Sequence, residues 1–78
     1  MEHSLAKLQK IFSDILEINP EQVTERSTMD NLDEWDSMKH LELVMSIESE
    51  FNVSFEVHEI VELNTVEKII EILEEKIA

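Results

Sequence analysis

The sequence of 78 residues contains no cysteine, no glycine and no tyrosine, and it has one proline and one tryptophan. Without cysteine, the chain itself can form no disulfide bond, no zinc–thiolate site and no catalytic thiol. Any thiol chemistry would have to arrive on an attached group. Without glycine, the chain also lacks the glycine-rich elbow that presents a catalytic serine in α/β-hydrolases, and the central glycine of a calcium-binding loop.

Basic residues are scarce: six lysines and arginines stand against nineteen aspartates and glutamates, which gives a formal net charge of −13. Such a charge repels nucleic acid and anionic membranes. It should attract partner proteins that carry basic patches and speed their encounter, most strongly at low salt. We therefore expect protein partners and no nucleic-acid partner.

Long apolar runs are absent as well, and no segment approaches the length that a membrane-spanning helix needs. The N-terminal segment MEHSLAKLQK has neither the apolar centre of a secretory signal nor the Arg-rich, acid-poor composition of a transit peptide. Apolar residues still make up 42% of the chain and recur at helical spacing, which argues against disorder. We expect one folded domain over residues 1–78, monomeric, cytoplasmic and not inserted in a membrane.

The first part of the chain has the apolar spacing of an amphipathic helix. Its apolar residues are Leu5, Leu8, Ile11, Phe12, Ile15 and Leu16. Ser4 can cap this helix, and Asn19-Pro20 should end it, because the residue before a proline avoids the α conformation. Residues 22–35 show no sustained period and predict a long loop. Its inward anchors are Val23, Met29 and Leu32.

A second helix is predicted from Ser37 to about Phe51, and it carries apolar residues on two faces. At about 100° per residue, one face collects Leu43, Val44, Ile47 and Phe51. The opposite face collects Met38, Leu41 and Met45, and it is flanked by Glu42 and Glu48. A domain this small can bury one face but hardly both, so we assign the Leu43 face to the core. The methionine-containing face is then left for a partner or ligand, although a central helix with both faces buried is an alternative.

The remainder of the chain predicts two further helices. Residues 56–62 can form one or two turns, with Val57, Ile60 and Val61 directed inward. The run Asn64-Thr65-Val66-Glu67 matches a capping box with Asn64 as the cap. The last helix should bury Val66, Ile69, Ile70, Leu73 and Ile77. The pattern as a whole predicts an all-α four-helix bundle with a short third helix and a long loop between helices one and two.

Ser37 follows an acidic loop and opens the second helix, so its hydroxyl should be exposed. A serine nucleophile would need a base within reach, and the nearby Asp36 and His40 suggest a hydrolase. However, the helical angle turns His40 toward the core, and the sequence offers no obvious oxyanion hole. We therefore expect no catalytic activity from the protein itself and a packed or half-buried His40.

The motif Asp36-Ser37-Met38, followed by the apolar and acidic run Leu41–Met45, resembles the attachment site of acyl carrier proteins. The resemblance covers almost the whole chain. It implies that Ser37 carries 4′-phosphopantetheine, which a Mg²⁺-dependent phosphopantetheinyl transferase takes from coenzyme A. The thiol of that group would hold acyl intermediates as thioesters in lipid or specialised-metabolite biosynthesis, and partner enzymes would do the chemistry.

The resemblance also implies where partners and cargo bind. Enzymes with basic patches that load or transfer acyl groups would contact Asp36, Met38, Leu41, Glu42, Met45 and Glu48. Asp36 has two interpretations, transferase recognition and a helix cap, and both can hold. Cargo chains are expected in a cleft between the second and third helices, lined by Leu41, Val44, Phe55, Ile60 and Leu63.

Three positions depart from the pattern of fatty-acid-synthesis carriers: Lys39 stands for an acidic residue, Trp35 for a small residue and Met38 for leucine. These departures favour a stand-alone carrier that serves a dedicated pathway. Two alternatives stay open, namely an aminoacyl carrier of the D-alanyl type and an unmodified acidic docking module with the same fold. Asp30 and Asp33 precede Asp36 at three-residue spacing, but the calcium-loop pattern is missing and no dedicated metal site is expected.

Overall fold

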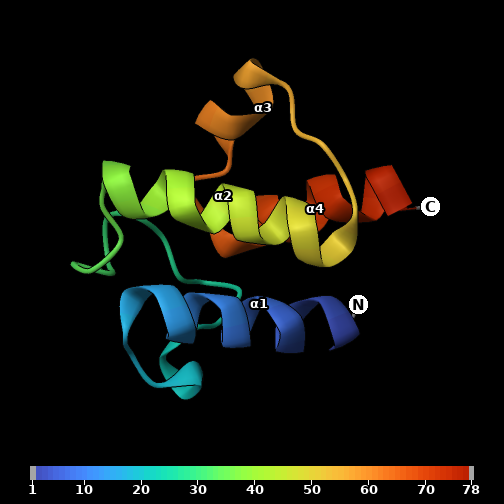
Figure 1. Cartoon of the computed structure of the whole chain (residues 1–78). Coiled ribbons are helices and arrows are strands. Elements are labelled where there is room, and N and C mark those ends of the chain that lie inside the picture. Colours follow the sequence, from blue (N-terminus) through green and yellow to red (C-terminus); the bar gives the residue numbers. More distant parts are fainter. Residues whose placement is uncertain (1, 78) are drawn as a thin grey trace.

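The computed structural model describes residues 2–77, which form four α-helices and one short 3₁₀ helix (Figure 1). The helices are α1 (Glu2–Leu16), η1 (Pro20–Gln22), α2 (Ser37–Phe51), α3 (Val57–Glu62) and α4 (Val66–Ile77). The predicted fold class is confirmed. The regular elements formed by the described residues are all helices, the third helix is short, and a long connection joins α1 to α2. No helix among residues 2–77 is long and apolar enough to cross a membrane.

The helices enclose a single hydrophobic core. Figure 1 shows α1 lying along one side of α2 and running in the opposite direction, while α3 lies across the other side of α2. α1, α2 and α4 each contribute an apolar stripe, as the three- and four-residue spacing predicts. The buried apolar side chains are Leu8, Ile11, Phe12, Leu16, Val23, Leu32, Trp35, Leu43, Val44, Ile47, Phe55, Leu63, Val66, Ile69, Ile70, Ile72 and Leu73.

Both predicted limits of α1 are wrong. Ser4 does not cap the helix, because α1 already includes Glu2 and Ser4 is buried within it. The helix ends at Leu16, and Glu17 has a positive φ of 58°, the left-handed conformation that commonly terminates a helix. Pro20 does not act as the stop signal, since it begins η1 instead, where its fixed φ and missing N–H are well tolerated.

The long loop is held against the core by buried apolar side chains. Val23, Leu32 and Trp35 are buried as anchors, and Met29 is partly buried. Trp35 packs edge-to-face on Phe12 of α1, with ring centroids 4.9 Å apart and an interplanar angle of 88°. The loop also pairs with the α3–α4 connection through a single antiparallel bridge between Thr28 and Thr65. The chain that leads into α2 is therefore tied to both α1 and the start of α4.

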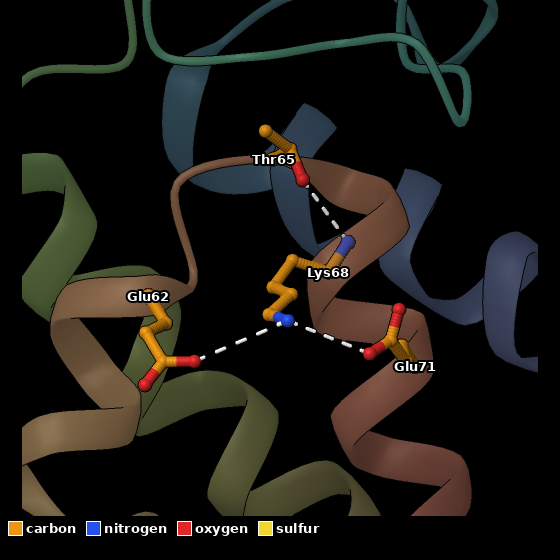
Figure 2. Close-up of polar contacts among 4 residues, drawn as sticks. All are labelled: Glu62, Thr65, Lys68 and Glu71. Carbon is orange, nitrogen blue, oxygen red and sulfur yellow. Dashed lines mark hydrogen bonds and ion pairs between the residues drawn. The ribbon is translucent and has the colours of Figure 1, made fainter.

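The cap of α4 is Thr65 and not the predicted Asn64. The Thr65 hydroxyl accepts a hydrogen bond from the backbone N–H of Lys68 at 3.0 Å, as Figure 2 shows. The two neighbouring residues are both good cap formers, so the pattern could not choose between them. Lys68 then extends its ammonium group toward Glu62 of α3 at 4.0 Å and Glu71 of α4 at 3.4 Å (Figure 2).

α3 differs most from expectation, because two of its predicted inward residues point outward. Val57 is 80% exposed and Val61 is 73% exposed, while Ile60 is partly buried against the core. Six residues make fewer than two turns, too few for periodicity to define a face. In the last helix, Ile77 is exposed and Ile72 is buried, which also differs from the predicted stripe.

Candidate functional site

Ser37 is the first residue of α2, and its side chain is exposed. The preceding residue, Asp36, has an extended backbone and serves as the N-cap: its Oδ1 accepts a hydrogen bond from the backbone N–H of Lys39 at 2.9 Å. The carbonyl of Asp36 accepts the first helical hydrogen bond, from the N–H of His40 at 2.8 Å. The sequence thus places a hydroxyl at a capped helix N-terminus where another protein can reach it.

This helix end favours a negative group. The first N–H groups of a helix have no partner within it, and the aligned peptide dipoles give the N-terminus a partial positive charge. Asp33, Glu34 and Asp36 are exposed close by in the sequence, and they oppose that preference. A phosphodiester on an exposed Ser37 would gain about 0.3–1 kcal/mol from the helix end before this repulsion is counted.

His40 lies one turn after Ser37, and other groups occupy both of its ring nitrogens. The indole Nε1–H of Trp35 donates to Nδ1 at 3.1 Å, and Nε2 lies 2.9 Å from the carbonyl oxygen of Ile60 in α3. Because an indole N–H can only donate, Nδ1 must accept, and the proton therefore sits on Nε2, which donates to Ile60. The predicted half-buried position of His40 is confirmed, and its ring nitrogens are committed to these two contacts.

The two faces of α2 separate as predicted. Leu43, Val44 and Ile47 are buried. On the other face, Met38 is 77% exposed, Leu41 58% and Met45 70%. These three side chains, which we call the methionine strip, form an apolar surface that begins one residue after Ser37.

The two carboxylates predicted to flank the methionine strip lie in different environments. Glu42 is exposed and pairs with Lys39, with 3.8 Å between the ammonium nitrogen and the carboxylate oxygen. Glu48 is partly buried, and its Oε2 accepts a hydrogen bond from the backbone N–H of Phe55 at 2.8 Å. Glu42 is thus available to a partner, whereas Glu48 already holds the connection between α2 and α3.

The predicted cargo-lining residues divide by burial. Val44, Phe55 and Leu63 belong to the core, Ile60 packs against it, and Leu41 is exposed. An open hollow of about 290 Å³ lies elsewhere, between α1 and α2. It is lined by Ile11, Asp14, Ile15, Ser46, Ser49 and Glu50. A cargo chain that contacts Val44, Phe55 or Leu63 would have to displace packed side chains, because these three residues are buried.

Sequence reasoning missed the polar contacts that hold this region together. The link from Trp35 through His40 to Ile60 joins the loop, α2 and α3, and the ion pair of Glu59 with Lys76 at 3.0 Å joins α3 to α4. The single tryptophan, which lies next to Asp36, was the one signal in the sequence that could have indicated the contacts from Trp35 through His40 to Ile60. Among the side chains that the structure describes, those of residues 4–77, no group of three or more histidines, aspartates or glutamates is arranged to hold a metal ion.

Comparison with known proteins defines the class. Residues 6–73 match the family model described as "Phosphopantetheine attachment site". The chain is 38% identical over 77 residues to the acyl carrier protein of Cylindrotheca sp. (strain N1), an alignment that covers 99% of this chain and 96% of that protein. It is also 38% identical over 72 residues to the acyl carrier protein of Petrotoga mobilis (strain DSM 10674 / SJ95), which covers 91% and 84%. This chain belongs to the acyl carrier protein family.

Membership defines the general function. The protein is a carrier, and 4′-phosphopantetheine is its prosthetic group. Bound to the carrier, that group supplies a thiol that holds acyl intermediates as thioesters. Proteins of this family work with acyl-handling enzymes, are modified by phosphopantetheinyl transferases and are generally not catalytic themselves. An exposed serine at a helix N-terminus, in a chain without cysteine, suits this chemistry.

Proposed function

We propose that Ser37 is the attachment residue and that its Oγ forms the phosphodiester to 4′-phosphopantetheine. The observation that carries this proposal is the exposure of Ser37 at the capped start of α2. Asp36 and Lys39 form the cap and leave the hydroxyl of Ser37 at the surface. The transferase supplies the base and the metal, so this chain has only to present the hydroxyl. No catalytic role is assigned to His40, whose ring nitrogens are hydrogen-bonded to other groups.

One experiment tests this assignment. The purified apo protein is incubated with coenzyme A, Mg²⁺ and a promiscuous phosphopantetheinyl transferase, and the intact mass is measured. We expect one pantetheinyl increment in the wild type and none in Ser37→Ala. Ser49→Ala is the matched control, because Ser49 is an exposed serine on the same helix and its variant should be modified normally. A Ser37→Ala protein that still gains the increment, or a wild type that gains none, would refute the assignment, and the latter result would favour an unmodified docking module.

We further propose that partner enzymes dock on the methionine strip with Asp36 and Glu42 at its edge. The strip is exposed and apolar, and the carboxylates give the sign of charge that basic patches on a partner would meet. Glu48 is included as a rim residue that also holds Phe55. If Met45→Ala leaves acyl transfer to a partner enzyme unchanged, the strip is not the docking surface.

Cargo is proposed to enter between α2 and α3, near Leu41, Val44, Phe55, Ile60 and Leu63. Support comes from the way α3 is attached. Its side chains Val57 and Val61 are exposed, and it is linked to its neighbours by the polar contacts of Ile60, Glu59 and Glu62. Such an element can shift at low energetic cost. Identical chemical shifts for these residues in the holo and acyl forms would contradict the proposal.

The nature of the cargo is proposed from the residues around Ser37. Lys39, Trp35 and Met38 favour a carrier of a dedicated acyl pathway, and an aminoacyl carrier of the D-alanyl type is the nearest alternative. Lys39 reverses the charge two residues after the proposed attachment residue and pairs with Glu42, which lowers the negative potential offered to a basic partner. Lys39→Glu should therefore raise the rate of loading by an enzyme of fatty-acid synthesis. If that rate does not change, Lys39 gives no support to the proposal of a dedicated pathway.

A further inference from the structure

The start of α2 is tied to α3 by a three-residue link that runs through one imidazole. Trp35 donates its indole N–H to Nδ1 of His40, and Nε2 of His40 donates to the carbonyl of Ile60. Trp35 precedes Ser37 by two residues and is only 2% exposed, so its position fixes the chain that enters α2. We call these contacts the Trp35–His40–Ile60 link.

Both ends of the link make further contacts. Trp35 lies near two other rings: Phe12 of α1 packs edge-to-face at 4.9 Å, and the His40 ring lies at 5.9 Å with an interplanar angle of 33°. At the other end, the Ile60 carbonyl belongs to α3, whose carboxylate Glu59 is paired with Lys76 of α4. His40 itself is anchored by its backbone N–H on the Asp36 carbonyl. The imidazole therefore connects Trp35, which precedes Ser37, and α2, which Ser37 begins, to Ile60 of α3.

We propose that His40 is a positioning residue for the modification of Ser37: by joining Trp35 to Ile60, it holds the start of α2 in the arrangement that a transferase must meet. This inference rests on the proposed function of Ser37. His40 touches neither the hydroxyl nor the reacting groups and acts through the backbone of residues 35–37. A bound conformation that is already formed in the free protein avoids the free-energy cost of ordering during the encounter. Loosening the link should therefore weaken recognition of an otherwise folded carrier.

The two contacts can be removed separately. Asparagine at position 40 keeps an acceptor near the place of Nδ1 but is too short to reach Ile60, so His40→Asn retains the contact to Trp35 alone. Glutamine keeps a donor near the place of Nε2, so His40→Gln retains the contact to Ile60 alone. His40→Phe keeps an aromatic ring and removes both contacts. Gln9→Ala is the matched control, because it removes another partly buried hydrogen bond to a backbone carbonyl, from Gln9 to Val23 at 2.8 Å, on α1.

Two measurements test the proposal on variants shown to be folded by circular dichroism. In the first, transferase kinetics are recorded at saturating coenzyme A with varied carrier. We expect kcat/KM to fall about three- to ten-fold in His40→Phe, mainly through KM, because both hydrogen bonds of the link are lost. His40→Asn should recover part of this loss, and Gln9→Ala should match the wild type. Equal kcat/KM in wild type, His40→Phe and His40→Asn would overturn the proposal, as would a loss in Gln9→Ala equal to that in His40→Phe.

The second measurement detects the Trp35–His40–Ile60 link directly and needs no transferase. Nitrogen-15 NMR of the imidazole should show the Nε2–H tautomer, and the Trp35 indole resonance should shift in His40→Gln but stay near its wild-type position in His40→Asn. Trp35 is the only tryptophan in the sequence, so its indole N–H resonance does not overlap with that of another tryptophan. The Nδ1–H tautomer, or an indole signal insensitive to His40→Gln, would refute the link. If the wild type shows the link but is never modified, the proposed function of Ser37 fails on its own, and the two failures are thereby distinguished.

Discussion

At the scale of single residues, α2 assigns opposite roles to side chains that lie two positions apart. Leu43 is 1% exposed and Leu41 is 58% exposed. We expect Leu43→Ala to lower the free energy of unfolding by about 2–5 kcal/mol, because it removes a packed side chain and leaves a cavity. Leu41→Ala should stay within about 0.5 kcal/mol, since its side chain is largely in water. Urea unfolding followed by circular dichroism checks both values, and similar losses in the two variants would contradict this assignment of faces.

Substitutions can separate the hydrogen bond that Asp36 accepts as a helix cap from the effect of its charge. Asparagine offers the same Oδ1 to the N–H of Lys39, so Asp36→Asn should change unfolding by less than about 0.5 kcal/mol, whereas Asp36→Ala should cost about 1 kcal/mol. If the transferase also recognises the charge, Asp36→Asn should be modified more slowly than wild type despite its intact cap. Modification rates are measured beside the unfolding curves. If Asp36→Asn is modified at the wild-type rate, Asp36 acts only as a helix cap and its charge has no role in recognition by the transferase.

Residue-level prediction worked where burial follows from periodicity and failed where hydrogen bonds decide. The apolar spacing of α2 correctly separated Leu43 from Leu41. It could not show that Glu48 bonds the N–H of Phe55, or that Trp35 and His40 are partners, because these pairs depend on how distant segments meet. The exposed position of Ser37 was predictable, because an N-terminal helix position after an acidic loop is a local feature.

At the scale of elements, α3 depends on a carboxylate whose state changes with pH. The backbone N–H of Glu56 donates to Glu59 at 2.7 Å, and Lys76 pairs with it at 3.0 Å. First the hydrogen bond from Glu56 and then the bond from Lys76 lower the pKa of Glu59 below its ordinary value of 4.5. The stabilisation is therefore complete above about pH 4.5 and is lost as the pH falls toward and through the lowered pKa in the folded protein.

This linkage predicts a local acid response of α3. On acidification below pH 4.5, amide hydrogen exchange in α3 should quicken relative to α1 and α2, and Glu59→Gln should show fast exchange already at neutral pH. Glu62→Gln is the control, because it removes a carboxylate from the same helix with a longer 4.0 Å pair and no hydrogen bond to the cap. Exchange in α3 that keeps a constant ratio to exchange in α1 and α2 as the pH falls, or that is equal in both variants, would show that the Glu59 contacts do not hold the helix.

The same helix shows why its orientation could not be predicted. α1, α2 and α4 have 15, 15 and 12 residues, and their spacing correctly defined most of their buried faces. α3 has six residues, and its position is set by the carbonyl of Ile60 and the ion pair of Glu59, which periodicity does not describe. Val57 and Val61 are exposed for that reason, despite being strongly apolar.

At the scale of the whole molecule, the charge of −13 is spread over a body of 29 × 25 × 20 Å. Electrostatic screening extends about 30 Å at 0.01 M salt, which is as long as the molecule, and about 8 Å at 0.15 M, which reaches only near neighbours. In dilute salt almost every carboxylate therefore repels every other. The described ion pairs are at least partly exposed and offset little of this repulsion.

Salt should consequently have opposite effects on folding and on function. Raising NaCl from about 0.01 to 0.15 M should stabilise the fold by on the order of 1 kcal/mol, or about 4–8 °C in Tm for a domain of this size, because repulsion is screened. The same change should slow encounter with a basic transferase, because attraction is screened too. The double variant Glu25→Gln/Glu74→Gln, which neutralises two carboxylates lining one hollow beside α4, should begin with a higher Tm and gain less from salt. A Tm that falls with added salt would mean that the ion pairs, and not the net charge, dominate the electrostatics of the fold.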